Sequence, residues 1–124
     1  MELMIESLDT YEDTSATTTE TRVLQRPVDL VHLARYTLGD AATEREVLAL
    51  FRTQSHFLLK RLKETTDQAS RQRTVSTLKA SARGIGAWRV AFAAEQANGA
   101  KDVRVLEDRI EEANRFIGAL LGNA

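Results

Sequence analysis

Apolar residues recur at steps of three and four along most of this sequence, and that spacing restricts the possible fold more than any other feature. An α-helix has about 3.6 residues per turn, so these steps place the apolar side chains on one face. No segment alternates apolar and polar residues with a period of two, which argues against a β-sheet. Six glycines and one proline among 124 residues leave long segments free to be helical. The sequence therefore predicts an all-α fold.

Helices are predicted in five segments after Pro27. Asp40 or Thr43 is expected to cap the second of them, because both residue types accept hydrogen bonds from a first helical turn. The five segments are 28–38, 42–67, a third that follows the expected cap Ser70 and is interrupted by Gly84 and Gly86, 87–97 before the stop signal Asn98-Gly99, and a last that begins near Asp102.

The apolar positions of these segments predict an antiparallel up-down-up-down four-helix bundle, with the short first helix lying across one end. The last segment has steps of three and four throughout, which is typical of antiparallel packing. Tyr36 is expected at the margin of the core. The predicted core consists of Val28, Val31, Leu33, Leu38, Val47, Leu48, Phe51, Leu58, Leu59, Leu62, Val75, Leu78, Ala82, Ile85, Val90, Phe92, Ala93, Ala97, Val103, Leu106, Ile110, Ala113, Ile117 and Leu120.

Residues 1–26 differ in composition from the rest of the chain. They contain six acidic and two basic residues, six threonines and one aromatic residue, Tyr11. Such a segment buries too little apolar surface to offset its loss of conformational entropy. It is predicted to be a flexible acidic tail, with at most a weak helical turn in Met1–Leu8. The alternative is an acidic arm that folds onto the bundle, residues 27–124, whose net charge is near +3.

Composition excludes several classes of function. The absence of cysteine rules out disulfides, thiolate metal sites and cysteine nucleophiles. His32 and His56 have no carboxylate at ligand spacing, so neither a metal site nor a cofactor is predicted. A net charge of -1 gives no general argument for nucleic acid or an anionic membrane. No apolar run approaches the roughly 18 residues of a membrane span, and no secretory signal is evident. A cytoplasmic protein is expected.

The third predicted helix carries a polar face opposite its core residues. Residues at steps of three and four share one side of a helix. Here they join a hydroxyl to a lysine one turn later and an arginine two turns later, beside a small side chain that leaves the surface open. Arg71 is expected to add to the basic character of this surface. We call it the Ser76 strip, and it consists of Gln72, Arg73, Ser76, Lys79, Ala80 and Arg83.

The stretch Val75–Ala87 resembles the signature of histidine-containing phosphotransfer (HPt) domains. That signature is histidine, any residue, an aliphatic, lysine, glycine, any residue, a small residue, two further residues, an aliphatic and glycine. Leu38-Gly39-Asp40 before a helix with Phe51, and the apolar run Val90–Glu95, are also similar to the family. The resemblance covers about residues 28–121 and implies the same bundle. The residues that match the signature are Leu78, Lys79, Ala82, Ile85 and Gly86.

Two positions depart from the HPt pattern: the phosphate-accepting histidine falls on Ser76 and the glycine one turn later on Ala80. An imidazole, with a pKa near about 6.5, is nucleophilic at neutral pH. A serine hydroxyl requires a nearby base, and positions 72, 73, 79, 80 and 83 supply none. The resemblance thus implies a non-enzymatic HPt-like protein of two-component phosphorelay signalling. It would bind a response-regulator receiver domain or a histidine kinase without carrying phosphohistidine.

Lys79 resembles the family's lysine that steadies the phosphoryl group, and here it is expected to meet carboxylates of the partner. Receiver domains present an acidic pocket, which a basic strip fits. Two alternatives remain open. One is a structural or dimerising bundle without a phosphorelay partner, in which the last helix pairs chains, so the chain is expected to be a monomer or a weak dimer. The other is a switch by serine phosphorylation, with Arg73 and Lys79 pairing with the phosphate.

The remaining chemical groups are given structural roles. His32 and His56 are interpreted as ordinary boundary or surface residues. Trp88 is predicted to pack with Phe92 on one face, with an interface anchor as the alternative. The acidic residues of the last helix are predicted to form a solvated face, paired in part with neighbouring arginines. These acids are Glu107, Asp108, Glu111 and Glu112, and the arginines are Arg104, Arg109 and Arg115.

Overall fold

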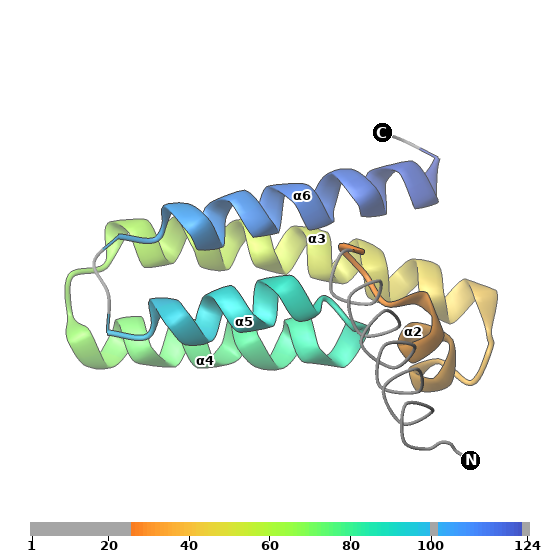
Figure 1. Ribbon diagram of the computed structural model, residues 1–124, viewed down its shortest axis with the longest axis horizontal. Helices are drawn as coiled ribbons and strands as arrows, with labels where there is room; N and C mark the ends of the chain where they lie inside the picture. The colour runs from red at the N-terminus through yellow and green to blue at the C-terminus, as the bar shows by residue number, and fades with distance from the viewer. Residues whose placement is uncertain (1–25, 100–101, 123–124) are drawn as a thin grey trace, which may run out of the picture.

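The computed structural model describes residues 26–99 and 102–122, which form five α-helices and contain no strand (Figure 1). The all-α prediction is confirmed. The predicted tail, apart from Arg26, and its predicted helical turn in Met1–Leu8 lie outside the described residues. The helices are α2 Leu30–Tyr36, α3 Ala41–Glu64, α4 Gln68–Ile85, α5 Trp88–Ala97 and α6 Arg104–Leu121.

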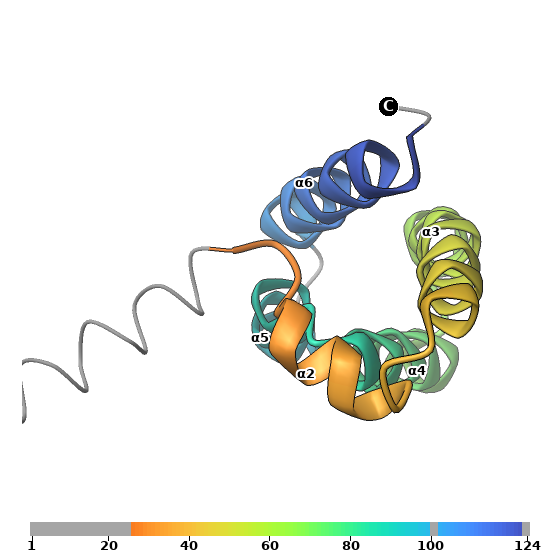
Figure 2. The ribbon, with the colours of Figure 1, turned by 90° about the vertical axis from the view of Figure 1, so that its right-hand side faces the viewer.

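Four of the helices pack in a ring and form a helical bundle. α3 contacts α4, α4 contacts α5, α5 contacts α6, and α6 returns to α3. Figure 2 views the four helices of the ring nearly end-on, with α2 crossing the end of α4 and α5. Burying a leucine or isoleucine side chain contributes roughly 1.5–3 kcal/mol, so the apolar interior supplies the main stabilisation. Its largest fully buried apolar side chains are Val28, Leu33, Leu62, Leu78, Val90, Leu106, Ile110 and Ile117.

Aspartates cap the first three described helices. The Asp40 carboxylate accepts a hydrogen bond of 3.0 Å from the backbone N–H of Thr43 at the start of α3. Asp67 accepts one of 2.8 Å from Ser70 at the start of α4. An aspartate suits this position because its oxygens satisfy open N–H groups and its charge opposes the helix dipole. The prediction of Asp40 as a cap is confirmed. Ser70 as the cap of α4 is wrong, since α4 begins at Gln68.

α4 ends in a Schellman motif at Gly86. Ala87 N–H donates to the Ala82 carbonyl at 2.8 Å, and Gly86 N–H to the Arg83 carbonyl at 3.3 Å. Gly86 adopts the left-handed conformation, φ 82°, that this motif requires. Gly84, in contrast, lies within the helix. The expected interruption at Gly84 is therefore wrong, because a single glycine costs a helix only about 1 kcal/mol.

The short helix α2 is fixed against the turn between α4 and α5. Asp29 N–H donates to the Gly86 carbonyl at 2.8 Å, and the indole Nε1–H of Trp88 donates to the Asp29 carboxylate at 3.0 Å. The ring of His32 lies edge-on to Trp88, with centroids 4.8 Å apart, and its Nε2 is 3.2 Å from the Gly84 carbonyl. A carbonyl only accepts, so Nε2 carries the proton in this contact. These contacts hold α2 across the bundle end.

Part of the predicted core around α2 is exposed instead. Val31 is exposed, and Leu38 is 92% exposed with φ 56° in the turn after the helix. Tyr36, expected at the margin, is also exposed. A helix of seven residues makes only about two turns, and α2 buries Leu33 alone among its members. Val28, just before the helix, is fully buried as predicted.

Two further core predictions are wrong in the later helices. Phe92 is 67% exposed, because α5 turns Val90 and Ala94 inward and residue 92 lies about 200° around the helix from residue 90. Leu120 is exposed in the last turn of α6. The inward face of α6 otherwise follows the predicted spacing.

Candidate functional site

The Ser76 strip lies on the outer side of α4. The opposite face of the helix is closed into the core by Val75, Leu78, Ala82 and Ile85. Ser76 is exposed near the middle of the helix, one turn before the exposed Ala80. The exposed members of the strip are Gln72, Arg73, Ser76, Ala80 and Arg83, and Lys79 is partly buried.

Lys79 forms an ion pair that joins α4 to α5. Its Nζ atom lies 3.0 Å from a carboxylate oxygen of Glu95, and the two side chains are 33% and 62% exposed. Pairs this accessible to water contribute about 0–1 kcal/mol. A carboxylate from another molecule can therefore replace Glu95 at small cost. Glu95 ends the apolar run of α5 and places an acid beside the strip.

Arg71 does not belong to the basic surface on which it was expected. Its guanidinium donates to the Leu62 carbonyl at 2.7 Å and to the Thr65 carbonyl at 3.1 Å. These carbonyls lie at the end of α3, where the last turn leaves acceptors open and the helix dipole favours a cation. Arg71 thus fixes the turn between α3 and α4. The strip's positive charge comes from Arg73, Lys79 and Arg83.

Among the residues that the structure describes, the Ser76 hydroxyl has no general base in contact with it. Activation of serine requires a base within about 2.6–3.2 Å of the hydroxyl oxygen. In the described part of the chain, no histidine or carboxylate is hydrogen-bonded to Ser76. Arg73 donates instead to the Ser70 hydroxyl at 3.0 Å. The strip presents cations and a hydroxyl, which is a surface suited to binding an acidic partner.

The two histidines lie on different elements and have different surroundings. His32 is the partly buried contact between α2 and the α4–α5 turn. His56 is exposed on α3. Across residues 26–99 and 102–122, no group of three histidine, aspartate or glutamate side chains has a metal-binding arrangement.

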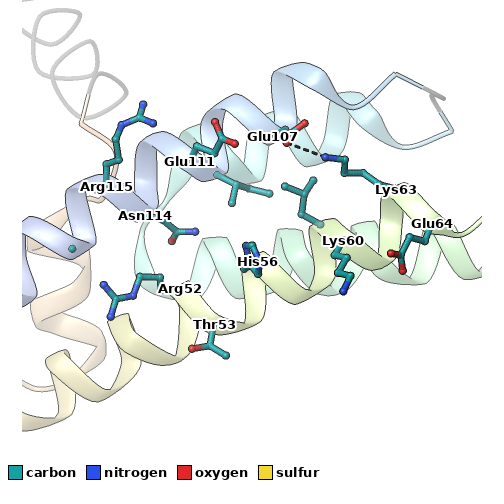
Figure 3. Close-up of a pocket in the computed structure, with 13 residues that line it drawn as sticks. Arg52, Thr53, His56, Lys60, Lys63, Glu64, Glu107, Glu111, Asn114 and Arg115 are labelled. Atoms are coloured by element: carbon teal, nitrogen blue, oxygen red, sulfur yellow. Dashed lines mark hydrogen bonds and ion pairs between the residues drawn. The ribbon is translucent and has the colours of Figure 1, made fainter. Parts of the chain in front are cut away.

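A groove of about 1120 Å³ separates α3 from α6 (Figure 3). Leu59, Ile110 and Gly118 contribute apolar lining. Charged side chains of both signs stand along its edges, and Figure 3 shows them pointing in different directions rather than toward one point. Lys63 and Glu107 close one end with an ion pair of 3.0 Å. We call this the α3–α6 groove.

Sequence reasoning missed the polar contact between these two helices. The buried hydroxyl of Ser55 accepts a hydrogen bond of 3.1 Å from the Asn114 amide, and donates to the Arg52 carbonyl at 3.2 Å. The Asn114 Oδ1 atom is buried without a hydrogen bond. Ser55 lies on the core side of α3, between Phe51 and Leu59 in the apolar spacing. A polar residue at such a position was the sequence feature that could have indicated this contact.

Trp88 and Phe92 do not form the predicted packed pair. Trp88 is partly buried and its indole is held by Asp29, whereas Phe92 points to solvent. The Asp29 carboxyl itself is affected by two opposing causes. Partial burial raises its pKa. The hydrogen bonds from Trp88 and from the N–H groups of His32 and Val31 lower the pKa by more than burial raises it, so the net pKa is below its usual value.

The acidic face of α6 is paired differently from the prediction. Glu112 lies 3.1 Å from Arg89 of α5 and 3.9 Å from Arg109, so pairing with Arg109 is confirmed. Glu107 pairs with Lys63 of α3. Arg104 forms its ion pair, at 2.9 Å, with Asp102, which precedes α6. The partners of neighbouring helices could not be read from the sequence of α6 alone.

Comparisons with protein-family models, with curated proteins and with solved structures give no match for this chain. Within the described residues, no helix has both the length and the apolar character needed to span a membrane. The functional argument therefore depends on the Ser76 strip and on the geometry around it.

Proposed function

We propose that this chain is an HPt-like protein of two-component phosphorelay signalling that binds a receiver domain or a histidine kinase and does not relay phosphate. The bundle is then the antiparallel up-down-up-down arrangement of four helices that HPt domains use, with α2 across one end, and the protein is cytoplasmic. The observation that carries the proposal is the exposed Ser76, with Lys79 one turn later, on the outer face of α4.

The absence of relay follows from the chemistry at position 76. A relay residue must accept a phosphoryl group from an acyl phosphate and return it. A serine without a base is a poor nucleophile, and a phosphoserine ester is too stable to pass the group on. The Ala80 methyl also occupies space that the HPt glycine leaves open beside the acceptor. The proposed role is therefore competition with true relay partners for the receiver surface.

Charge supports docking at this surface. Arg73, Lys79 and Arg83 present positive charge along nearly three turns of α4. The acidic pocket of a receiver is complementary to this charge, and such complementarity raises the association rate. Exchange of the Lys79–Glu95 pair for a pair with the receiver keeps Lys79 satisfied throughout.

Charge reversal tests the docking surface. The double variant Lys79→Glu, Arg83→Glu is expected to reduce receiver binding by at least tenfold, which corresponds to about 1.4 kcal/mol. The matched control is Lys60→Glu, Arg115→Glu, which makes the same change in net charge at exposed positions of the α3–α6 groove. Affinities for a panel of isolated receiver domains are measured by titration calorimetry. Equal losses in the two variants would refute docking through α4.

Phosphate transfer tests the absence of relay. The protein is mixed with a radiolabelled phospho-receiver, and no label is expected on it. Label that appears on the protein and is lost in Ser76→Ala would contradict the proposal. The double variant Ser76→His, Ala80→Gly is expected to gain acid-labile phosphate, because it restores both the imidazole and the space beside it.

The alternative is a structural or dimerising bundle with no phosphorelay partner. Pairing of chains through the regular apolar face of α6 is disfavoured, because Leu106, Ile110, Ala113 and Ile117 are buried inside the bundle. A phosphoserine switch is compatible with Arg73 and Lys79 near Ser76. Treatment with a serine kinase followed by mass spectrometry of Ser76 separates that function from simple docking.

A further inference from the structure

A second groove, of about 610 Å³, opens between α5 and α6 on a different pair of helices from the Ser76 strip. Its borders carry two large apolar side chains that face solvent, Phe92 at 67% exposure and Val105 at 62%. Trp88 and Leu106 contribute further apolar lining, and its charged lining residues are Arg89, Asp102 and Arg109. We call this the α5–α6 groove. It exposes more apolar surface than isolated surface residues do, as interaction sites commonly do.

The described chain begins beside this groove. Val28 is fully buried, and Asp29 is hydrogen-bonded at 3.0 Å to the indole of Trp88, which lines the groove. Figure 2 shows the first coloured residues of the chain next to α5 and α6. The 25 residues that precede Arg26 therefore enter the fold at this side of the bundle.

The preceding segment contains a pattern that fits the groove. Met1, Met4, Ile5 and Leu8 have the spacing of one face of a helix, and the other faces carry Glu2, Leu3, Glu6 and Ser7. A random-coil chain of 17 residues, the length of residues 9–25, has a root-mean-square span of roughly 20–25 Å. The ten residues of α5 extend over about 15 Å. Met1–Leu8 is thus within reach of the whole groove.

We propose that Met1–Leu8 binds in the α5–α6 groove of the same chain as an amphipathic helix. Its apolar face packs on Trp88, Phe92 and Val105, and Glu2 and Glu6 lie on its solvent side. This is the helix-in-groove mode of peptide recognition, made intramolecular by the linker. The basic Ser76 strip attracts Glu2 and Glu6 but offers no large apolar side chain to cover Met1, Met4, Ile5 and Leu8, so the groove is the better site.

The absence of cysteine allows a direct distance experiment on the full chain. Glu6→Cys places a single nitroxide label on the side of Met1–Leu8 away from its apolar face. Paramagnetic broadening of amide and indole signals is then recorded by NMR. The expected result is strong broadening of the Trp88 indole, Phe92 and Val105 signals and none at Ser76.

Two pairs of variants test both sides of the contact. Ile5→Asp in the labelled chain is expected to reduce the broadening at Trp88 about tenfold, whereas Ser7→Asp, with the same charge change beside the apolar face, retains most of it. On the groove side, Phe92→Asp is expected to abolish the broadening. Phe57→Asp, at a similarly exposed phenylalanine of α3, leaves it unchanged.

Three outcomes would overturn the proposal. Broadening centred on Ser76 and Lys79 would place the segment on the strip. Absence of broadening at the groove would show that the segment does not bind there. In the third experiment, chains that carry the nitroxide but no NMR isotope are mixed with isotope-enriched chains that carry no nitroxide. Broadening of the Trp88 signal in this mixture would show that the segment binds a second copy. None of these results depends on receiver binding, so the proposed function is tested separately.

Discussion

Substitution of Gly86 by alanine tests whether the turn between α4 and α5 positions α2. Gly86 has φ 82°, and an alanine Cβ would lie 3.0 Å from both the Cβ and the carbonyl oxygen of Asp29. Gly122, which ends α6, provides the matched control. It has nearly the same φ, 80°, but a Cβ there meets no atom within 4 Å.

The expected loss in free energy of unfolding of Gly86→Ala has two parts, and the control Gly122→Ala shares only the first of them. A left-handed conformation costs a residue with a Cβ about 1–2 kcal/mol, and both variants lose this amount. At Gly86 the Asp29 backbone must also move, which weakens the 2.8 Å bond from Asp29 N–H to the Gly86 carbonyl and the 3.0 Å bond from Trp88. Each such bond contributes about 1 kcal/mol. We expect Gly86→Ala to cost about 2 kcal/mol more than Gly122→Ala.

Thermal and urea unfolding measure this difference. For a domain of this size, about 2 kcal/mol corresponds to a difference in Tm of roughly 8–16 °C. Circular dichroism follows the helices, and the fluorescence of Trp88, the chain's single tryptophan, reports on the contact with α2. Equal losses of stability in the two variants, with unchanged Trp88 fluorescence, would refute the claim that close approach of α2 requires glycine at position 86.

Three further effects follow from the same structure. Gly84→Ala is expected to raise the free energy of unfolding by about 0.5–1 kcal/mol in urea titrations, because Gly84 is helical and a Cβ there meets no atom within 4 Å. Ser55→Ala should lower it by about 1–3 kcal/mol, since the Asn114 amide loses its acceptor; an unchanged midpoint would contradict this. The pKa of Asp29 is lowered in the folded state, so its contribution is present above the unfolded pKa of about 3.9 and is lost as pH falls through the folded pKa. Asp29→Ala should therefore flatten the acid side of the stability profile.

The helices could be predicted because their apolar spacing is a local property. α3, α5 and the inward face of α6 follow the steps of three and four, and the stop at Asn98 agrees with the end of α5 at Ala97. Local start signals were less reliable where a competing residue stood nearby. Asp67 lies three residues before Ser70 and caps α4 in its place, because its carboxylate is a strong acceptor for the Ser70 N–H.

Features that depend on which helices become neighbours could not be predicted in this way. Apolar spacing assigns Val31 and Phe92 to a buried face only if another element covers them, and no described element covers either side chain enough to bury it. Arg71 had the same limitation: its position on α4 indicated a basic surface, but the last carbonyls of α3 bind its guanidinium. Both grooves are products of helix pairing, which a single helical pattern does not encode.

The candidate site was predictable in its geometry and incomplete in its electrostatics. The spacing of the Ser76 strip predicted that Ser76 faces outward, and Ser76 is exposed on α4. It did not reveal that Glu95 reaches Lys79 from α5. This pair makes Lys79 selective for acidic ligands. A neutral ligand gains nothing by displacing Glu95, whereas a carboxylate-rich pocket offers Lys79 several acceptors at once. Glu95→Gln should consequently strengthen binding of an acidic receiver severalfold, because it removes both the competing carboxylate and a like-charge repulsion. A weaker interaction in that variant would mean that Glu95 itself contacts the partner.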